Sequence, residues 1–439
     1  MREQFINGKI SIGKRVKRGA YMQKSKSLPI TEARLCFINI FTIPIPFYRE
    51  GSLFHLDFLP SSPSEHISEA IIRSSLDRNG IYYERDHLIA QEITRKTDDP
   101  NRYSCWICDH SIEKWMENAV YAYKSLIKKE NKEMKIEKTD TVLSVLKNQR
   151  IAIVFLNISL ENTNADELIF IQQYYSAHRM NAVSNIYRAL TGNEPIKDKI
   201  YYSVICEILD VDDEQKVPAK LVTKYPQLFY GILTSDEGWR NVPESCAENR
   251  LRNCWSTREY LRVHALGKRV LSFKMHHLDC FAKAQEYELN FKTAIGAERH
   301  PMKEGPSVTL AGLDHGPLLV LELASKTYYL LREVHKQFTN FLLIDPALIK
   351  LPRMLWLYWG NHNRIYSNIE RLISQDGIAE LDSLNSTIRT SMHLPEEYER
   401  LKAKLNQVEK TFSSKSGMVF SFFAIVLSLF SLMKIFIFK

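Results

Sequence analysis

Two short clusters of cysteine and histidine are the residues of this chain best suited to chemistry. The first is Cys105-Trp106-Ile107-Cys108, and the second is the pentapeptide HHLDC at 276–280. Structural zinc prefers these ligand types, and each spacing would let two side chains reach one ion. The sequence therefore predicts a candidate zinc site, formed by Cys105, Cys108, His277 and Cys280. This site requires two segments about 170 residues apart to meet, and the alternative is small buried cysteines and core histidines without a metal.

Two pairs of histidine and aspartate could act as acid–base groups. They are His277 with Asp279, and His315 with Asp314. Histidine titrates near neutral pH, and an aspartate can orient its ring for proton transfer. Each pair equally fits an ordinary polar segment, and the chain contains no GxGxxG, GxSxG, HExxH or P-loop motif. The sequence therefore leaves catalysis open but favours a role without it, and zinc is the one cofactor that it suggests.

Residues 418–438 form an apolar stretch, MVFSFFAIVLSLFSLMKIFIF, in which Lys434 is the single charged residue. About twenty-one helical residues cross a hydrocarbon core of about 30 Å if Lys434 extends its ammonium to the headgroups. Ser421, Ser428 and Ser431 can bond to carbonyl oxygens of their own helix. The stretch predicts a transmembrane helix in preference to a buried or in-plane helix. Lysines at 402, 404, 410 and 415 favour a cytoplasmic N-terminal body.

A helical stalk is predicted immediately before this apolar stretch. Pro395 suits the first turn of a helix, where its missing N–H would have had no partner. The apolar seam follows at intervals of three and four residues, typical of an amphipathic helix or a short coiled coil: Tyr398, Leu401, Leu405, Val408 and Phe412. The seam could pack on the protein's own body or against a second copy. The expected partners are therefore a lipid bilayer and, through the stalk, a homo-oligomer.

Charge and composition divide the 439 residues into five regions. Of the net charge of +8, residues 1–27 contribute +7, because they hold eight basic residues and one acid. We expect this leader to be disordered and solvated, and it lacks the apolar core of a secretory signal. Nucleic acid is not an expected partner of the leader. The other regions are a mixed α/β region at 28–138, an α/β body at 139–323, a helical region and stalk at 324–412, and a transmembrane anchor at 413–439. Seven scattered cysteines favour a reducing compartment.

The hydrophobic pattern predicts an α+β or α/β cytoplasmic body, followed by an all-α stalk and one C-terminal transmembrane helix. A strand at 150–158, a helix at 166–190 and a strand at 199–209 indicate a βαβ unit. Further strands are expected at 35–47, 228–233, 260–264, 269–275, 308–310 and 318–323, with a hairpin turn at 265–268. Helices are expected at 65–78, at 109–129 and from 324 onward, and a charged linker at 128–138.

This layout resembles that of the CorA-type magnesium transporters, in which an α/β cytoplasmic body and long helices precede the membrane segment. That family has two C-terminal spans and a Gly-Met-Asn motif at the end of the first, whereas here Gly417-Met418-Val419 precedes a single expected span. The resemblance implies a shared layout and no shared site residue.

The sequence is best interpreted as a single-pass, C-terminally anchored membrane protein, in the inner membrane if bacterial. Its cytoplasmic body would act in sensing, as a scaffold or as an effector. The alternatives are a membrane-tethered, possibly metal-dependent enzyme and an oligomeric pore or ion-conducting protein with a CorA-like layout.

Overall fold

The computed structural model describes residues 28–44, 67–85, 101–126, 136–258, 261–275, 316–343 and 382–404, with a few single residues from 406 to 428. Its strands are β1 (Ile30–Thr42), β2 (Tyr82–Glu84), β3 (Arg102–Cys108), β4 (Ile136–Leu146), β5 (Ile151–Thr163), β6 (Tyr201–Asp210), β7 (Cys254–Arg258), β8 (Leu261–Leu266) and β9 (Arg269–Lys274). Its helices are α1 (Glu69–Arg78), α3 (His110–Leu126), α4 (Ala165–Ala182), α5 (Ser184–Thr191), η2 (Lys197–Lys199), α6 (Pro218–Lys224), α7 (Pro226–Thr234), η3 (Trp239–Asn241), α8 (Glu244–Leu251), α11 (Gly316–Leu343) and α13 (Asp382–Ser391).

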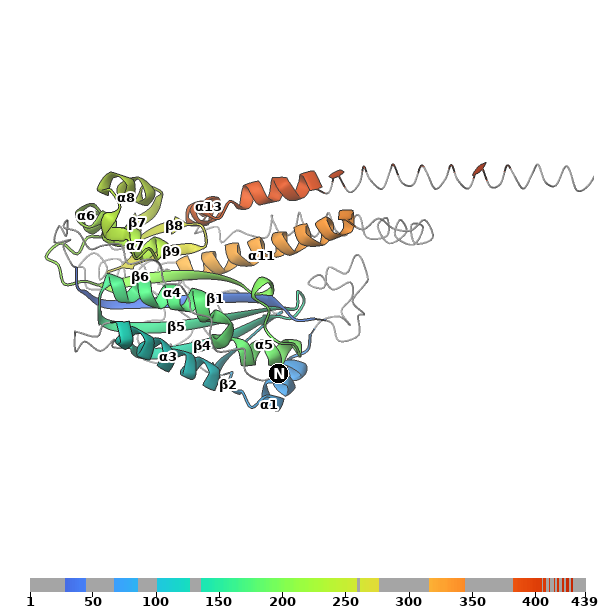
Figure 1. The fold of residues 1–439 in the computed structure, drawn as a ribbon, viewed down its shortest axis with the longest axis horizontal. Helices are drawn as coiled ribbons and strands as arrows, with labels where there is room; N and C mark the ends of the chain where they lie inside the picture. Colours follow the sequence, from blue (N-terminus) through green and yellow to red (C-terminus); the bar gives the residue numbers. More distant parts are fainter. Residues whose placement is uncertain are drawn as a thin grey trace, which may run out of the picture.

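A nine-stranded sheet organises the body, in the order β2-β3-β4-β5-β1-β6-β9-β8-β7 (Figure 1). The long strand β1 lies in the middle and is antiparallel to both β5 and β6. Strands β6 and β9 pair in parallel, and the other neighbouring strands pair antiparallel. The structure confirms a mixed α/β body.

Helices cover both faces of this sheet. Successive side chains of a strand point to opposite faces, and those of β1 are buried on both. On one face, Phe37 of β1 stacks on Tyr175 of α4 with ring centroids 3.9 Å apart. On the other face, Thr42 Oγ1 lies 2.7 Å from the hydroxyl of Tyr329 in α11. We call these the α4 face and the α11 face. Helices α3, α5 and α7 also pack on the α4 face, whereas α13 joins α11.

The predicted βαβ unit has its three elements, but its two strands are not neighbours. Strand β5, helices α4 and α5, and strand β6 follow each other in the chain, and β1 lies between the two strands. Because β1 is antiparallel to both, β5 and β6 run in the same direction. The strands and helices of the predicted βαβ unit are therefore present, and the strand between β5 and β6 comes from an earlier part of the chain.

Three secondary-structure predictions are wrong. Residues 228–233 belong to helix α7, which begins with Pro226 and buries Phe229 and Ile232 three residues apart. Residues 318–323 belong to α11, while 308–310 lie outside the described residues. The linker expected at 128–138 runs into β4, which was missed. Short apolar runs fit a strand or a buried helix equally well, and tertiary packing selects between them.

Other predictions are confirmed. Of the strand expected at 35–47, residues 35–42 belong to β1, 43–44 are not in a strand, and 45–47 lie outside the described residues. Strands β8 and β9 form the expected hairpin around Gly267, whose φ is +57°. Helix α1 ends before Asn79 as expected but begins later than residue 65, because the Ser68 hydroxyl caps it by accepting from the Ile71 N–H at 3.3 Å.

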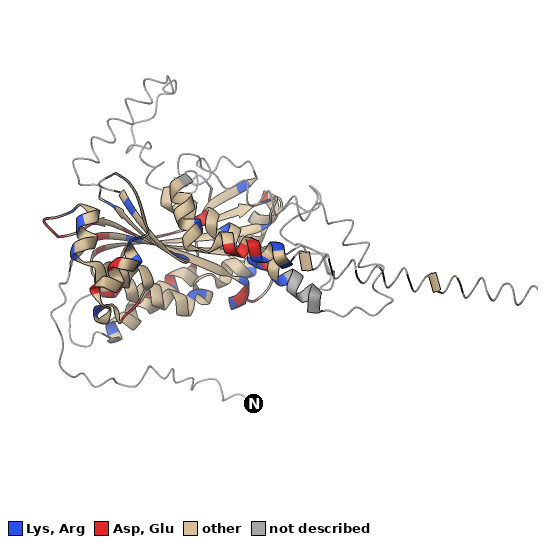
Figure 2. Ribbon diagram, turned by 90° about the horizontal axis from the view of Figure 1, so that it is seen from above, with Lys and Arg blue, Asp and Glu red and all other residues tan. Residues whose placement is uncertain are grey.

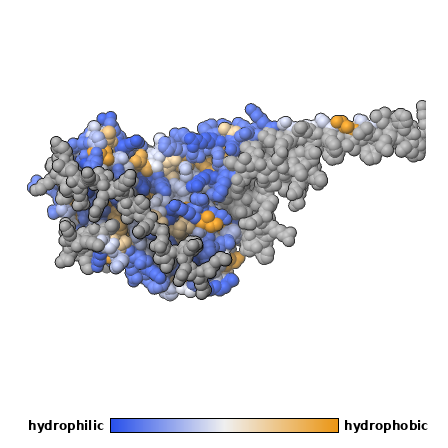
Figure 3. All heavy atoms as spheres, in the orientation of Figure 1, coloured by the Kyte–Doolittle hydropathy of each residue, from blue (hydrophilic) through white to orange (hydrophobic). Residues whose placement is uncertain are grey.

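One hydrophobic core connects these elements. It extends in sequence from Leu28 to Leu401, and the boundary expected at residue 138 falls inside β4. Figure 2 shows both signs of charge distributed over the described helices and strands. The visible described surface in Figure 3 is mostly hydrophilic, with hydrophobic residues in small separate groups. The basic leader at 1–27 lies outside the described residues.

The chain leaves the body through a helix at 394–404, and the single described residues from 406 to 428 are also helical. Leu401 of the expected seam is fully buried against the core. No helix within the described residues is long and apolar enough to cross a membrane. Most of residues 413–439 lie outside that part, so the stalk and the anchor stay predictions.

Candidate anion-binding site

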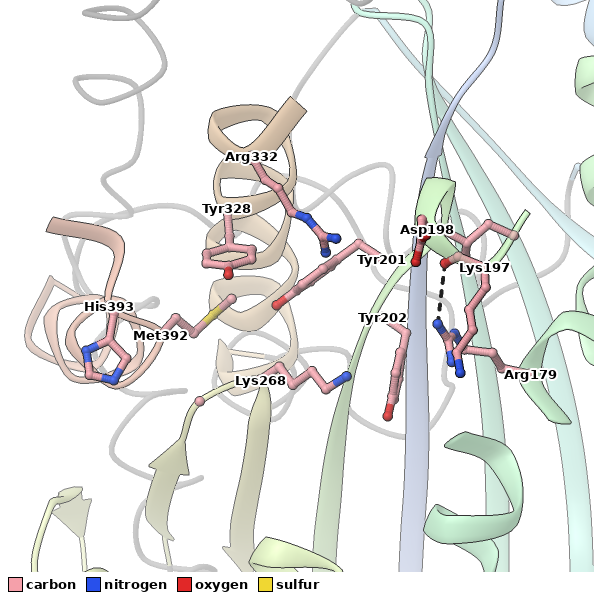
Figure 4. A pocket seen from close by; sticks show the side chains of 12 residues that line it. Arg179, Lys197, Asp198, Tyr201, Tyr202, Lys268, Tyr328, Arg332, Met392 and His393 are labelled. Carbon is pink, nitrogen blue, oxygen red and sulfur yellow. Dashed lines mark hydrogen bonds between the residues drawn. The ribbon is translucent and has the colours of Figure 1, made fainter. Parts of the chain in front are cut away.

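A pocket of about 340 Å³ lies at the N-terminal end of β6, where the two helical layers meet (Figure 4). Its walls come from α4, η2, β6, the β8–β9 turn, α11 and the turn that follows α13. Segments separated by more than 200 residues in sequence therefore contribute to one cavity.

The start of β6 explains why both layers reach this cavity. Tyr201 points to the α11 face and Tyr202 to the α4 face, because neighbouring residues of a strand alternate. The β8–β9 turn is held beside them by the Val204 N–H, which donates to the Lys268 carbonyl oxygen at 3.0 Å. The parallel pairing of β6 with β9 thus brings the Lys268 side chain to Tyr202.

Two cations form the inner part of the pocket. Arg179 is 8% exposed, and its guanidinium donates to the carbonyl oxygens of Ser176 at 3.0 Å and Lys197 at 3.4 Å. The Lys268 ammonium lies 3.4 Å from the centroid of the Tyr202 ring, and the Arg179 guanidinium carbon lies 4.8 Å from it. Figure 4 shows Tyr202 between the two cations. We call Arg179, Lys268 and Tyr202 the cationic half of the pocket.

Burial and the surrounding charges shift the pKa values of Lys268 and Tyr202. Burial lowers the pKa of Lys268, and the positive charges of Arg179 and Arg269 lower it further, whereas Tyr202 opposes the shift. Burial alone would raise the pKa of Tyr202, but its hydrogen bond with Ser176 and the Lys268 charge outweigh burial, so that pKa lies below its usual value. The site therefore holds two like charges close together in a partly desolvated place.

The opposite wall is aromatic and apolar. Tyr201 and Tyr328 have ring centroids 5.3 Å apart, and Met392, 4% exposed, lies beside them in Figure 4. Burial, followed by the neighbouring Tyr328, raises the pKa of Tyr201, so its hydroxyl stays neutral. We call Tyr201, Tyr328 and Met392 the aromatic half of the pocket.

The charges of the pocket do not balance. Arg179, Lys197, Lys268 and Arg332 line it together with one carboxylate, Asp198, and none of these four cations forms an ion pair with a described carboxylate. The rim residues Lys197, Asp198, Arg332 and His393 are exposed, whereas Arg179 is buried. A buried cation without a counter-charge is unfavourable, and an anion entering from solvent would supply that charge. The arrangement is suited to binding an anionic molecule.

The cysteines expected to bind zinc lie in β3. Cys105 is fully buried, and burial raises the pKa of its thiol to about 12. Cys108 is exposed, with its sulfur 3.6 Å from Glu113 Oε1. Residues three apart in a strand point to opposite faces, so Cys105 and Cys108 lie on opposite faces of the sheet in this structure.

The other predicted site residues, His277, Asp279, Cys280, Asp314 and His315, lie outside the described residues. The four-ligand zinc site and the two acid–base pairs therefore stay predictions. In the part of the chain that the structure describes, no group of three or more His, Cys, Asp and Glu side chains could hold a metal ion.

The sequence contains weak signals for the pocket that we did not interpret as a site. Tyr201-Tyr202 opens a strand, and Gly267-Lys268 occupies a hairpin turn, where side chains are often functional. Neither motif predicts a partner for the other. Comparison of the chain with protein-family models, with curated proteins and with solved structures finds no match.

Proposed function

We propose that this is a membrane-anchored sensing protein, whose cytoplasmic body binds a small anion in the pocket and passes the binding event to the helix leading to the apolar segment at 418–438. The observation that carries the proposal is the shared wall of the pocket. Met392 and His393 line it, and they form the turn between α13 and the helix at 394–404. A molecule in the pocket would therefore contact both the body and the root of the stalk.

The turn that contributes Lys268 is also tied to the stalk root. The Gly267 N–H donates to the Ser391 carbonyl oxygen at 3.1 Å, and the Ser391 hydroxyl lies 3.4 Å from the Gly267 carbonyl oxygen. Lys268, the next residue, carries the charge that an anion would attract. Movement of Lys268 towards a ligand would thus act directly on the end of α13.

The backbone of His393 makes this junction a place where the angle between α13 and the helix at 394–404 can change. His393 has a φ of +58°, in the left-handed region, which is unfavourable by about 1–2 kcal/mol for a residue other than glycine. Its side chain is 73% exposed, so packing around that side chain contributes little to holding the conformation. A bound anion at the neighbouring wall could shift the balance between two conformations of this turn.

Two described residues support the proposed span. The Ser428 hydroxyl donates to the Ala424 carbonyl oxygen at 2.8 Å, which satisfies this polar group inside its own helix. Ile425 is 60% exposed, the arrangement expected of a side chain that faces lipid. The cytoplasmic placement of the body follows from the lysines before the span.

Fractionation tests the anchor without requiring any ligand. Full-length protein should remain in membranes washed with sodium carbonate, whereas a chain ending at Phe412 should be released. Release of the full-length protein by carbonate would contradict the anchor.

Hydrogen exchange tests the coupling. Saturating sodium pyrophosphate, a small polyanion, should slow amide exchange of residues 391–404 in the detergent-solubilised full-length protein at least threefold. Lys268→Met should abolish this effect, and Lys220→Met, which removes an exposed lysine of α6 outside the pocket, should retain it. Unchanged exchange despite binding measured by calorimetry would contradict coupling.

A further inference from the structure

We infer that the ligand of the pocket is a soluble organic phosphate in which a phosphate group is joined to a flat aromatic portion, as in a mononucleotide. The inference rests on the proposed function, since it names the ligand class of the same site. The two halves of the pocket carry the argument: the cationic half would hold the phosphate and the aromatic half would hold the ring.

The cationic half suits a phosphate better than a carboxylate. A planar carboxylate is best bound by the two parallel N–H groups of a free arginine fork. Each terminal nitrogen of Arg179 already donates one N–H to a backbone carbonyl oxygen, of Ser176 or Lys197, so this fork is partly engaged and three of its five N–H groups remain. Further positive charge comes from separate directions, from Lys268 in the β8–β9 turn and Arg332 in α11. A tetrahedral group with three terminal oxygens can meet cations from several directions at once.

The aromatic half indicates that the ligand is more than a phosphate. Tyr201 and Tyr328 are each partly exposed, and Met392 lies at the same wall. Aromatic side chains and thioethers favour flat apolar groups, and stacking on an aromatic side chain contributes substantially to the binding of nucleobases. The volume agrees, because about 340 Å³ corresponds to roughly ten water molecules and exceeds the space that a bare phosphate needs.

The position of the pocket favours a soluble ligand over a lipid headgroup. Under the proposed anchor, the bilayer begins near residue 418, which is 25 residues beyond His393. A continuous helix of that length measures about 37 Å. Headgroups would then lie well outside the reach of the Lys268 and Arg332 side chains, whereas a dissolved phosphate ester can enter from solvent past the exposed rim.

Calorimetry on the detergent-solubilised full-length protein, with four probes of matched chemistry, tests the inference. Phenyl phosphate and adenosine monophosphate combine a ring with a phosphate, glycerol phosphate lacks the ring, and benzoate replaces the phosphate by a carboxylate. We expect phenyl phosphate to bind about tenfold more tightly than glycerol phosphate and at least tenfold more tightly than benzoate. Vesicles containing phosphatidic acid test the lipid source, and we expect no competition from them.

Single substitutions test which part of the ligand each half of the pocket binds. Lys268→Met should weaken phenyl phosphate at least tenfold, whereas Tyr328→Leu should remove the preference for phenyl over glycerol phosphate and leave the affinity for glycerol phosphate unchanged. Lys220→Met controls for net charge, and Arg332→Gln at the exposed rim provides a second charge variant if Lys268→Met does not fold.

Several results would overturn the inference. Equal affinities for benzoate and phenyl phosphate would show that the pocket does not recognise the phosphate group. Equal affinities for glycerol phosphate and phenyl phosphate would show that it does not recognise the ring. Competition by phosphatidic acid vesicles would assign the site to a lipid headgroup. Failure of all the phosphate esters to bind would refute this ligand class, while carbonate extraction, which needs no ligand, would still decide the anchor independently.

Discussion

The buried ion pair between Arg102 of β3 and Glu322 of α11 gives the sharpest test of how α11 is held on the sheet. Arg102 Nη2 lies 2.9 Å from Glu322 Oε1, without the alignment of a hydrogen bond, and the two side chains are 3% and 6% exposed. Arg102 Nε donates to the Ser144 hydroxyl at 2.6 Å. Glu322→Gln keeps the shape of the side chain but leaves the guanidinium buried without its counter-charge.

Removing one partner of a buried pair lowers the free energy of unfolding by about 3–5 kcal/mol. At about 2 °C per kcal/mol, the lower end of the range for a domain of 150–250 residues, the melting temperature should fall by roughly 6–10 °C. The double substitution Arg102→Met with Glu322→Leu removes both charges and should recover to within about 1–2 kcal/mol of the natural protein.

Tryptophan fluorescence during thermal unfolding in detergent gives the melting temperatures of the full-length natural protein, the single variant and the double variant. A shift of less than about 2 °C for Glu322→Gln would refute the reasoning, because the site would then accommodate an uncompensated arginine. A double variant as unstable as the single one would show that shape, and not charge, matters at this contact.

Two further predictions concern buried positions in helix α7 and strand β8. In Gly231→Ala, the new methyl group would lie 2.6 Å from Trp239 Cβ and Cγ, so we expect a loss of about 1–3 kcal/mol in thermal unfolding, and an unchanged melting temperature would contradict this packing. Burial, together with Arg262, lowers the pKa of His264 to about 4, below its usual 6.5. As the pH falls, His264 therefore binds a proton in the unfolded chain at a higher pH than in the folded protein. The free energy of unfolding should fall by up to about 1.4 kcal/mol per pH unit as the pH drops from 6.5 to 4. His264→Gln should reduce that slope, measured by urea unfolding at several pH values, and an unaltered slope would contradict the assignment.

Local pattern predicted the elements whose signals lie within a few residues. Continuous apolar runs predicted β1 and β5, and Gly267 marked the hairpin turn because its φ of +57° favours glycine. The same reasoning failed at α7, where a six-residue apolar run fits a strand or a buried helix and only its packing against α4, α8 and β9 selects the helix.

The pocket was decided by tertiary structure alone. Tyr202 and Lys268 meet because β6 pairs in parallel with β9, and Met392 joins them because α13 packs on β7 and β8. In β3, the alternation of the strand likewise places Cys105 and Cys108 on opposite faces of the sheet, which their spacing in the sequence does not reveal. Sequence pattern reports which side chains a segment buries and with what period. Which segments become neighbours depends on the free energy of burying those side chains against distant parts of the chain, and no local stretch contains that information.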